Sequence, residues 1–236
     1  MGTTYTKAEI LTKVNEWLTP ENVSLLYAQE FVNYTGVTSD TREKYTEVIA
    51  AHLLDKLSVF EKIEKIPREK SYNVGHEPKE FDFSSTRKEE QVARSFMGHA
   101  YNYIGKVIDY QTPLKNVQRD DAGKIDLLSW NEAERCAYIL ELKTQDSDET
   151  LLRCILEIDT YRRIVDAKKL LFDFELPTEA SVRKAALIYR HSRPRTHFCD
   201  SNINVRKLMK KLRVDLFVLD QDNKVVEAYY WEELEG

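Results

Sequence analysis

The segment GKIDLLSWNEAERCAYILELKT, residues 123–144, constrains the fold more than any other part of the chain. Two apolar stretches flank a short polar turn, which predicts two adjacent β-strands. Apolar residues occupy both faces of each strand, as is typical of a sheet covered by helices on both sides. Asp126, Glu141 and Lys143 interrupt this pattern with three charges. Charged groups in buried strands are costly without partners, so these residues are the first candidates for a functional site.

The remaining pattern after residue 83 predicts an α/β protein with a mixed central sheet flanked by helices. The expected order is helix 86–100, strands 103–110, 124–130 and 136–144, helix 150–171, strand 185–190, helix 204–212 and strand 214–220. We assign these elements to one core domain, residues 66–236.

Residues 1–65 show helical periodicity and predict an N-terminal helical subdomain or arm. A capping box formed by Thr6 and Glu9 opens the first helix. Thr19-Pro20 opens a second, which runs through Phe31, and a third spans about 40–63.

Composition bounds the class of protein. Three cysteines, Cys136, Cys154 and Cys199, are widely spaced, which favours reduced thiols in a cytoplasmic protein over a disulfide scaffold or a zinc site. The chain has no long uncharged apolar stretch and no export signal, so we expect no membrane segment.

The net charge of −5 argues against a surface that is basic throughout. Residues 181–213 nevertheless hold ten Lys and Arg residues against one acid. Within them, Arg190 ends a predicted core strand, and the segment 191–197 follows it as a loop, where α/β proteins meet ligands. Arg190, Arg193 and Arg195 are candidates for binding nucleic-acid phosphates. The alternative is a solvated face, the commoner location of Lys and Arg.

Strand geometry places two of the three central charges together. Side chains in a strand repeat with a period of two, so Glu141 and Lys143 share a face about 6.6 Å apart. With a four-residue turn and Trp130 opposite Arg135, Asp126 pairs with Ile139 and lies diagonal to Glu141 on that face. A turn longer or shorter by one residue would separate the acids.

Two carboxylates on one dry face require a compensating cation. Hard oxygen ligands suit Mg²⁺ or Mn²⁺, with Asp126, Glu141 and the backbone carbonyl of Leu142 as expected ligands. Lys143 is placed to orient a water molecule or to stabilise developing charge. This chemistry suits hydrolysis of a phosphodiester by an ion-activated water.

These residues resemble the signature of the PD-(D/E)xK nucleases, which have a restriction-endonuclease-like core. The match consists of Gly123-Lys-Ile-Asp126 followed by Glu141-Leu-Lys143, and Glu157 and Tyr161 are similar to the family's Q-x-x-x-Y helix motif with Glu in place of Gln. The resemblance covers about residues 86–190. It implies a metal-dependent deoxyribonuclease in which Glu157 and Tyr161 support the site, and DNA as the partner.

Family members often take another acid from the helix before the first strand. Glu89 falls near the centre of an apolar helical stripe that contains Val92 and Phe96, and is our candidate for a further metal ligand. The alternative is a capping box with Thr86, in which Glu89 binds only a backbone N–H.

Short E-x-K patterns also arise by chance in a chain with 32% charged residues, and Asp222-Asn-Lys224 is a D-x-K match in a predicted turn. A solvated Glu141–Lys143 pair at a sheet rim is therefore the structural alternative. The functional alternative to a nuclease is an inactive nuclease-fold module that binds a protein or nucleic-acid partner. A homodimer is compatible with cutting both strands of DNA.

Overall fold

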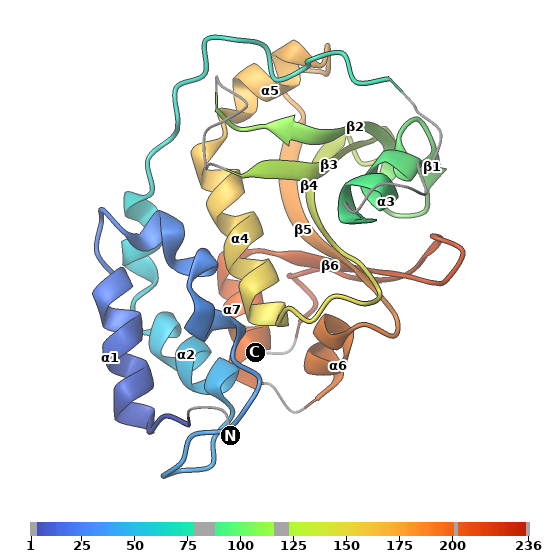
Figure 1. The fold of residues 1–236 in the computed structure, drawn as a ribbon. Coiled ribbons are helices and arrows are strands. Elements are labelled where there is room, and N and C mark those ends of the chain that lie inside the picture. Colours follow the sequence, from blue (N-terminus) through green and yellow to red (C-terminus); the bar gives the residue numbers. More distant parts are fainter. Residues whose placement is uncertain (1–3, 78–87, 116–122, 201–202, 235–236) are drawn as a thin grey trace.

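The computed structural model describes residues 4–77, 88–115, 123–200 and 203–234. Its centre is one seven-stranded sheet in which the strands follow their order in the chain (Figure 1). Strands β4 and β5 and strands β5 and β6 pair in parallel, and the other neighbours are antiparallel. The strands are β1 Ala100–Tyr101, β2 Gly105–Pro113, β3 Lys124–Asn131, β4 Cys136–Lys143, β5 Ser181–Tyr189, β6 Asp215–Leu219 and β7 Val225–Tyr229.

Helices cover both faces of the sheet, which confirms the expected mixed α/β class. Helix α4 (Leu151–Ile164) lies between the sheet and the N-terminal helices α1 (Lys7–Trp17) and α2 (Tyr45–Leu54), while α3 (Lys88–Phe96) lies on the other side (Figure 1). Helix α7 (Ile203–Leu212) packs against α2 and α4.

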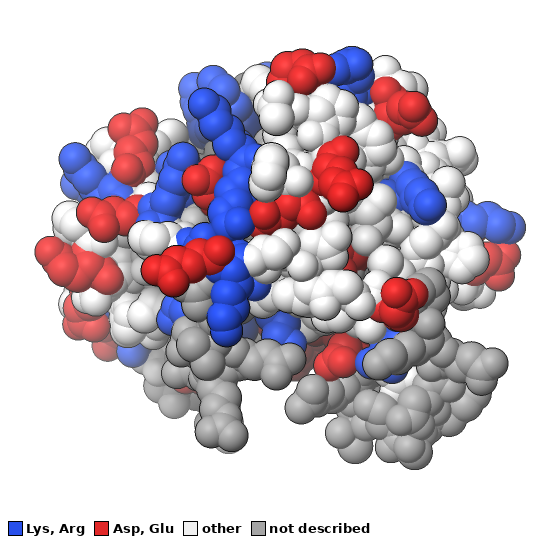
Figure 2. All heavy atoms as spheres, turned by 90° about the horizontal axis from the view of Figure 1, so that it is seen from above, with Lys and Arg blue, Asp and Glu red and all other residues white. Residues whose placement is uncertain are grey.

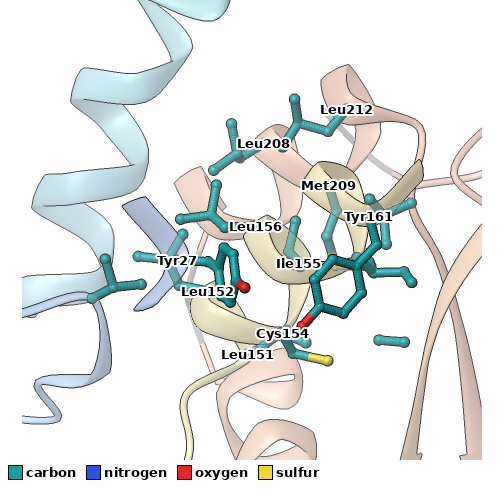
Figure 3. Close-up of a cluster of buried hydrophobic side chains, with 14 of the residues drawn as sticks. Tyr27, Leu151, Leu152, Cys154, Ile155, Leu156, Tyr161, Leu208, Met209 and Leu212 are labelled. Atoms are coloured by element: carbon teal, nitrogen blue, oxygen red, sulfur yellow. The ribbon is translucent and has the colours of Figure 1, made fainter. Parts of the chain in front are cut away.

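Two apolar clusters follow from this layering. One joins side chains of α4, α7 and the N-terminal helices to one sheet face, and Figure 3 shows Leu156 and Ile155 of α4 near Leu208 and Met209 of α7. The other joins α3 to the opposite face. Strand β4 is buried along its whole length because it lies at the centre of the sheet. Burial of this kind stabilises the fold by about 25 cal/mol per Å² of apolar surface.

Several expected helices are shorter than the hydrophobic pattern indicated. The second becomes two 3₁₀ helices, η1 Val23–Ala28 and η2 Glu30–Asn33, because Gln29 adopts an extended backbone between them. The third ends at Leu54 and is followed by the 3₁₀ helix η3, Leu57–Lys62.

The expected helix 150–171 is likewise two helices. Val165 is extended, and the Asp166 carboxylate accepts bonds from the Lys168 and Lys169 amides, which starts α5 (Ala167–Asp173). An N-cap of this kind competes with continuation of the preceding helix.

Other differences concern edges and connections. Strands β1 and β7 were not predicted, β2 extends to Pro113, and β5 begins at Ser181. The segment 191–197 was expected to be a loop, but Pro194 lies in the first turn of helix α6 (Arg193–Cys199), where proline is favoured. None of the described helices is both long and apolar enough to cross a lipid bilayer.

Candidate functional site

The β3–β4 hairpin brings the two central acids together. Leu127 faces Leu140 and Leu128 faces Ile139, so continuation of this register places Asp126 opposite Glu141. The expected pairing of Asp126 with Ile139 was therefore wrong by two residues. Because a shift of two preserves the alternation of side chains, both acids still share a face.

The turn itself explains the shift. Asn131 remains in the ladder opposite Cys136, and its side-chain oxygen accepts a hydrogen bond from the Glu134 amide at 3.2 Å. Arg135 closes the turn with a φ of 49°. The four turn residues are thus 132–135, one position later than expected at each end.

Both oxygens of the Asp126 carboxylate are held in place. Oδ2 accepts the Leu142 backbone N–H at 2.9 Å, and Oδ1 accepts the Gln111 side-chain amide at 2.8 Å. Burial raises the pKa of Asp126 to about 7, opposed by the Lys143 charge and reinforced by Glu89. The Asp126 carboxyl group is therefore at the margin of ionisation near neutral pH.

Lys143 lies at the centre of a buried cluster of carboxylates. Its Nζ is 2.7 Å from Glu141 Oε1, 2.7 Å from Glu149 Oε2 and 3.5 Å from Glu157 Oε2. Burial opposes the charged ammonium, but the Glu141 and Glu157 charges outweigh it and raise the Lys143 pKa well above its usual value. This pair is buried, so the rim-pair alternative, which requires solvated side chains, does not describe it.

One oxygen of the site has no partner among the described residues. Glu141 is 3% exposed, and its Oε2 accepts no hydrogen bond. Burial, then the nearby Asp126 and Glu157, raise the Glu141 pKa well above its usual value. A buried carboxylate oxygen without a donor is costly, and a cation would satisfy it.

The donor set therefore fits a hard divalent ion, with carboxylate oxygens of Asp126 and Glu141 directed to one face. Within the described ranges, no three His, Cys, Asp or Glu side chains are already gathered at the spacing of a metal site. In the structure, the positive charge of the Lys143 ammonium compensates the negative charge of the neighbouring carboxylates.

Helix α4 supplies the next contacts. The Tyr161 hydroxyl donates to Glu157 Oε1 at 2.8 Å, so the two residues of the helix motif contact each other directly. The Tyr27 ring from the N-terminal region meets the Tyr161 ring edge-on at 5.7 Å. Gly123 is required here, since an added Cβ would lie 1.8 Å from the Tyr161 hydroxyl oxygen.

Glu89 lines the same open cleft of about 720 Å³ as Asp126, Glu141 and Lys143. Burial raises the pKa of Glu89. Thr86, its alternative capping partner, lies outside the described residues.

The candidate phosphate-binding arginines have other partners. Arg190 and Arg195 both contact Glu227, at 3.0 and 2.7 Å. Arg193 donates to the Asp148 backbone carbonyl at the cleft rim. Figure 2 shows a different face, seen from above Figure 1 and away from α6; there Lys and Arg side chains form a narrow band between acidic ones.

Sequence reasoning missed Gln111 and Glu149. Gln111 continues the β2–β3 register opposite Asp126, but its strand was expected to end before it, and its φ of 51° is irregular for a strand. Glu149 directly precedes Thr150, which caps α4. An acid at the start of the helix that follows the E-x-K strand was the sequence signal that could have identified Glu149.

No family model, curated protein or solved structure matches the chain. Fold and site thus define a mixed α/β protein with an acidic cleft around a buried lysine, and the nuclease resemblance rests on the motif residues and their arrangement.

Proposed function

We propose that the protein is a metal-dependent nuclease of the PD-(D/E)xK type that hydrolyses DNA phosphodiester bonds. The observation that supports it most is the meeting of Asp126, Glu141 and Lys143 on one buried face, beside Glu157 of α4. The restriction-endonuclease-like assignment of the core is part of the same proposal.

Asp126 and Glu141 would hold Mg²⁺ or Mn²⁺, with Glu89 and the Leu142 carbonyl as further ligands. Such an ion would supply Lewis-acid polarisation and an acidified water. Gln111 and the Leu142 amide fix the orientation of Asp126. The Lys143 ammonium is held by Glu149 and Glu157 as well as by Glu141. It is positioned to donate a hydrogen bond to a water oxygen or to an anionic oxygen at this face.

The test is cleavage of plasmid and linear DNA with Mg²⁺ or Mn²⁺ by the wild-type chain and by Lys143→Ala. Lys224→Ala is the matched control, because Asp222-Asn-Lys224 has the same D-x-K spacing in an exposed turn. We expect Lys143→Ala to lose activity by a factor of at least about 10² and the control to retain it. Equal activity of the two variants would remove Lys143 from the mechanism.

The alternative function is an inactive module that binds a partner. The pairing of Arg190 and Arg195 with Glu227 favours it, because it removes two of the cations that the described residues could offer to DNA. Calorimetric titration with Mn²⁺ separates the two functions. If the wild type binds the ion and cleaves DNA, and Asp126→Asn loses ion binding, the nuclease is supported. Ion binding without cleavage of DNA supports the module.

A further inference from the structure

A second cleft, of about 790 Å³, shares no lining residue with the acidic cleft. Its walls are the last turn of α4, the end of α7, the first residues of β5, η3 and Trp231. Lys143 of β4 pairs with Ile188 of β5, and Arg183 lies five residues before Ile188. The two clefts are therefore separated by about 17 Å along the strand direction.

This second cleft is strongly basic. Seven Lys and Arg side chains line it, against the two acids Glu61 and Glu232. Part of the charge is internally balanced: Lys184 and Arg163 pair with the buried Asp159, and Arg183 pairs with Asp215 and Glu232.

The other four cations have no carboxylate partner within the part of the chain that the structure describes. They are Lys65, Arg162, Lys211 and Arg213. Arg162 donates its Nε to the Val182 carbonyl at 3.0 Å and is partly buried, which lowers its pKa. Arg213 lies over the Trp231 ring at 5.4 Å, which orients its planar guanidinium.

Helix ends account for only part of this charge. Arg162 and Arg163 lie in the last turn of α4, and Lys210 and Lys211 in the last turn of α7, where cations complement the helix dipole. Each helix end carries about half a negative charge. Two such ends leave most of the four unpaired cations uncompensated.

We propose that this basic cleft binds the phosphodiester backbone of a nucleic acid, as a contact separate from the acidic cleft. Its four unpaired cations come from α4, from α7 and the residue after it, and from the segment that follows η3, so they match successive phosphates better than one small anion. Guanidinium groups bind phosphate oxygens in pairs, and two of the unpaired cations are arginines. The inference does not depend on hydrolysis at the acidic cleft.

The test measures binding of fluorescent single-stranded and duplex DNA of about 20 nucleotides by anisotropy, in EDTA, between about 50 and 200 mM salt. The variant is Lys65→Gln/Lys211→Gln/Arg213→Gln, which changes exposed residues only. The matched control is Lys106→Gln/Lys168→Gln/Lys224→Gln, which removes the same charge from exposed lysines elsewhere.

We expect the cleft variant to bind at least about tenfold more weakly, with a log–log salt slope shallower by about 2, and the control to match the wild type. Equal affinity of wild type and cleft variant, or equal losses in both triple variants, would overturn the proposal. Binding of millimolar inorganic triphosphate by the wild type but not by the cleft variant, without measurable DNA binding, would overturn the proposal and assign the cleft to a small phosphate ligand instead. Wild-type DNA binding in EDTA without cleavage in Mg²⁺ would overturn the proposed nuclease alone.

Discussion

The Lys143 ammonium lies 2.7 Å from Glu141 Oε1, although the two residues are neighbours on one strand face rather than partners across strands. Both side chains are almost fully buried. The Lys143 ammonium and the Glu141 carboxylate therefore stabilise each other, because either charge alone would carry a large desolvation free energy in this buried site.

Lys143→Met should therefore destabilise the fold by roughly 3–5 kcal/mol at pH 8, since it leaves the Glu141 carboxylate buried without a counter-charge. The loss should be smaller at pH 5, where the carboxyl group can take up a proton. Urea unfolding in EDTA at both pH values measures it. Unchanged stability at pH 8 would contradict the buried ion pair.

Asp126 should make the ion-free protein less stable as pH rises. Its folded pKa of about 7 lies above the ordinary value of 3.8, so the folded state favours the protonated form. The stabilisation is complete below about pH 4 and is lost as pH rises to about 7, by roughly 3–5 kcal/mol. Asp126→Asn removes this titration and should be the more stable protein at pH 8 in EDTA.

The same unfolding series in Asp222→Asn is the control for that pH dependence, because Asp222 lies in an exposed turn. It should follow the wild-type profile. Addition of Mn²⁺ at pH 8 should stabilise the wild type and leave Asp126→Asn unchanged, since ion binding requires the ionised carboxylate.

Gly123→Ala should disturb the site through Tyr161, because the new Cβ and the Tyr161 hydroxyl cannot occupy their present positions. We expect loss of cleavage and a stability cost of about 1–3 kcal/mol, as for other overpacking substitutions. Gly75→Ala is the control: its φ is +73° but its Cβ meets open space, so it should cost about 1 kcal/mol without affecting cleavage.

The site was more predictable than the fold around it. Alternation in β4 places Glu141 and Lys143 on one face. Asp126 joins them for any β3–β4 register that differs from the expected one by an even number of residues, as the observed shift of two does. The exact register depended on Asn131 capping and on the positive φ of Arg135, which leave only weak signals in sequence.

Contacts between residues far apart in the chain could not be predicted from the sequence for a different reason. The basic excess of residues 181–213 divides between two places because Glu227 neutralises Arg190 and Arg195, while Arg213 stacks on Trp231. Charge counting along the chain cannot reveal which acid folds back onto which arginine.

Glu157→Gln should retain cleavage, because an amide oxygen can still accept the Tyr161 hydroxyl that now lies 2.8 Å from Glu157 Oε1. Lys143 keeps its two closer carboxylates at 2.7 Å. The change replaces a charge-assisted contact by a neutral one, worth about 1 kcal/mol or a few-fold in rate. Glu157→Ala removes the acceptor and should lose more; equal rates for the two variants would exclude this bond from the site.

Lys184 and Asp159 form a second buried ion pair, which joins β5 to α4 beside the basic cleft. Asp159 is fully buried and also contacts Arg163 Nε at 2.7 Å. Lys184→Met leaves one partner to a buried carboxylate and should cost roughly 3–5 kcal/mol, measured by urea unfolding at pH 7. The double variant Lys184→Met/Asp159→Leu should recover most of the loss, because an apolar pair of similar volume carries no desolvation penalty. Additive losses in the double variant would show that the two side chains stabilise the fold independently, contrary to their contact.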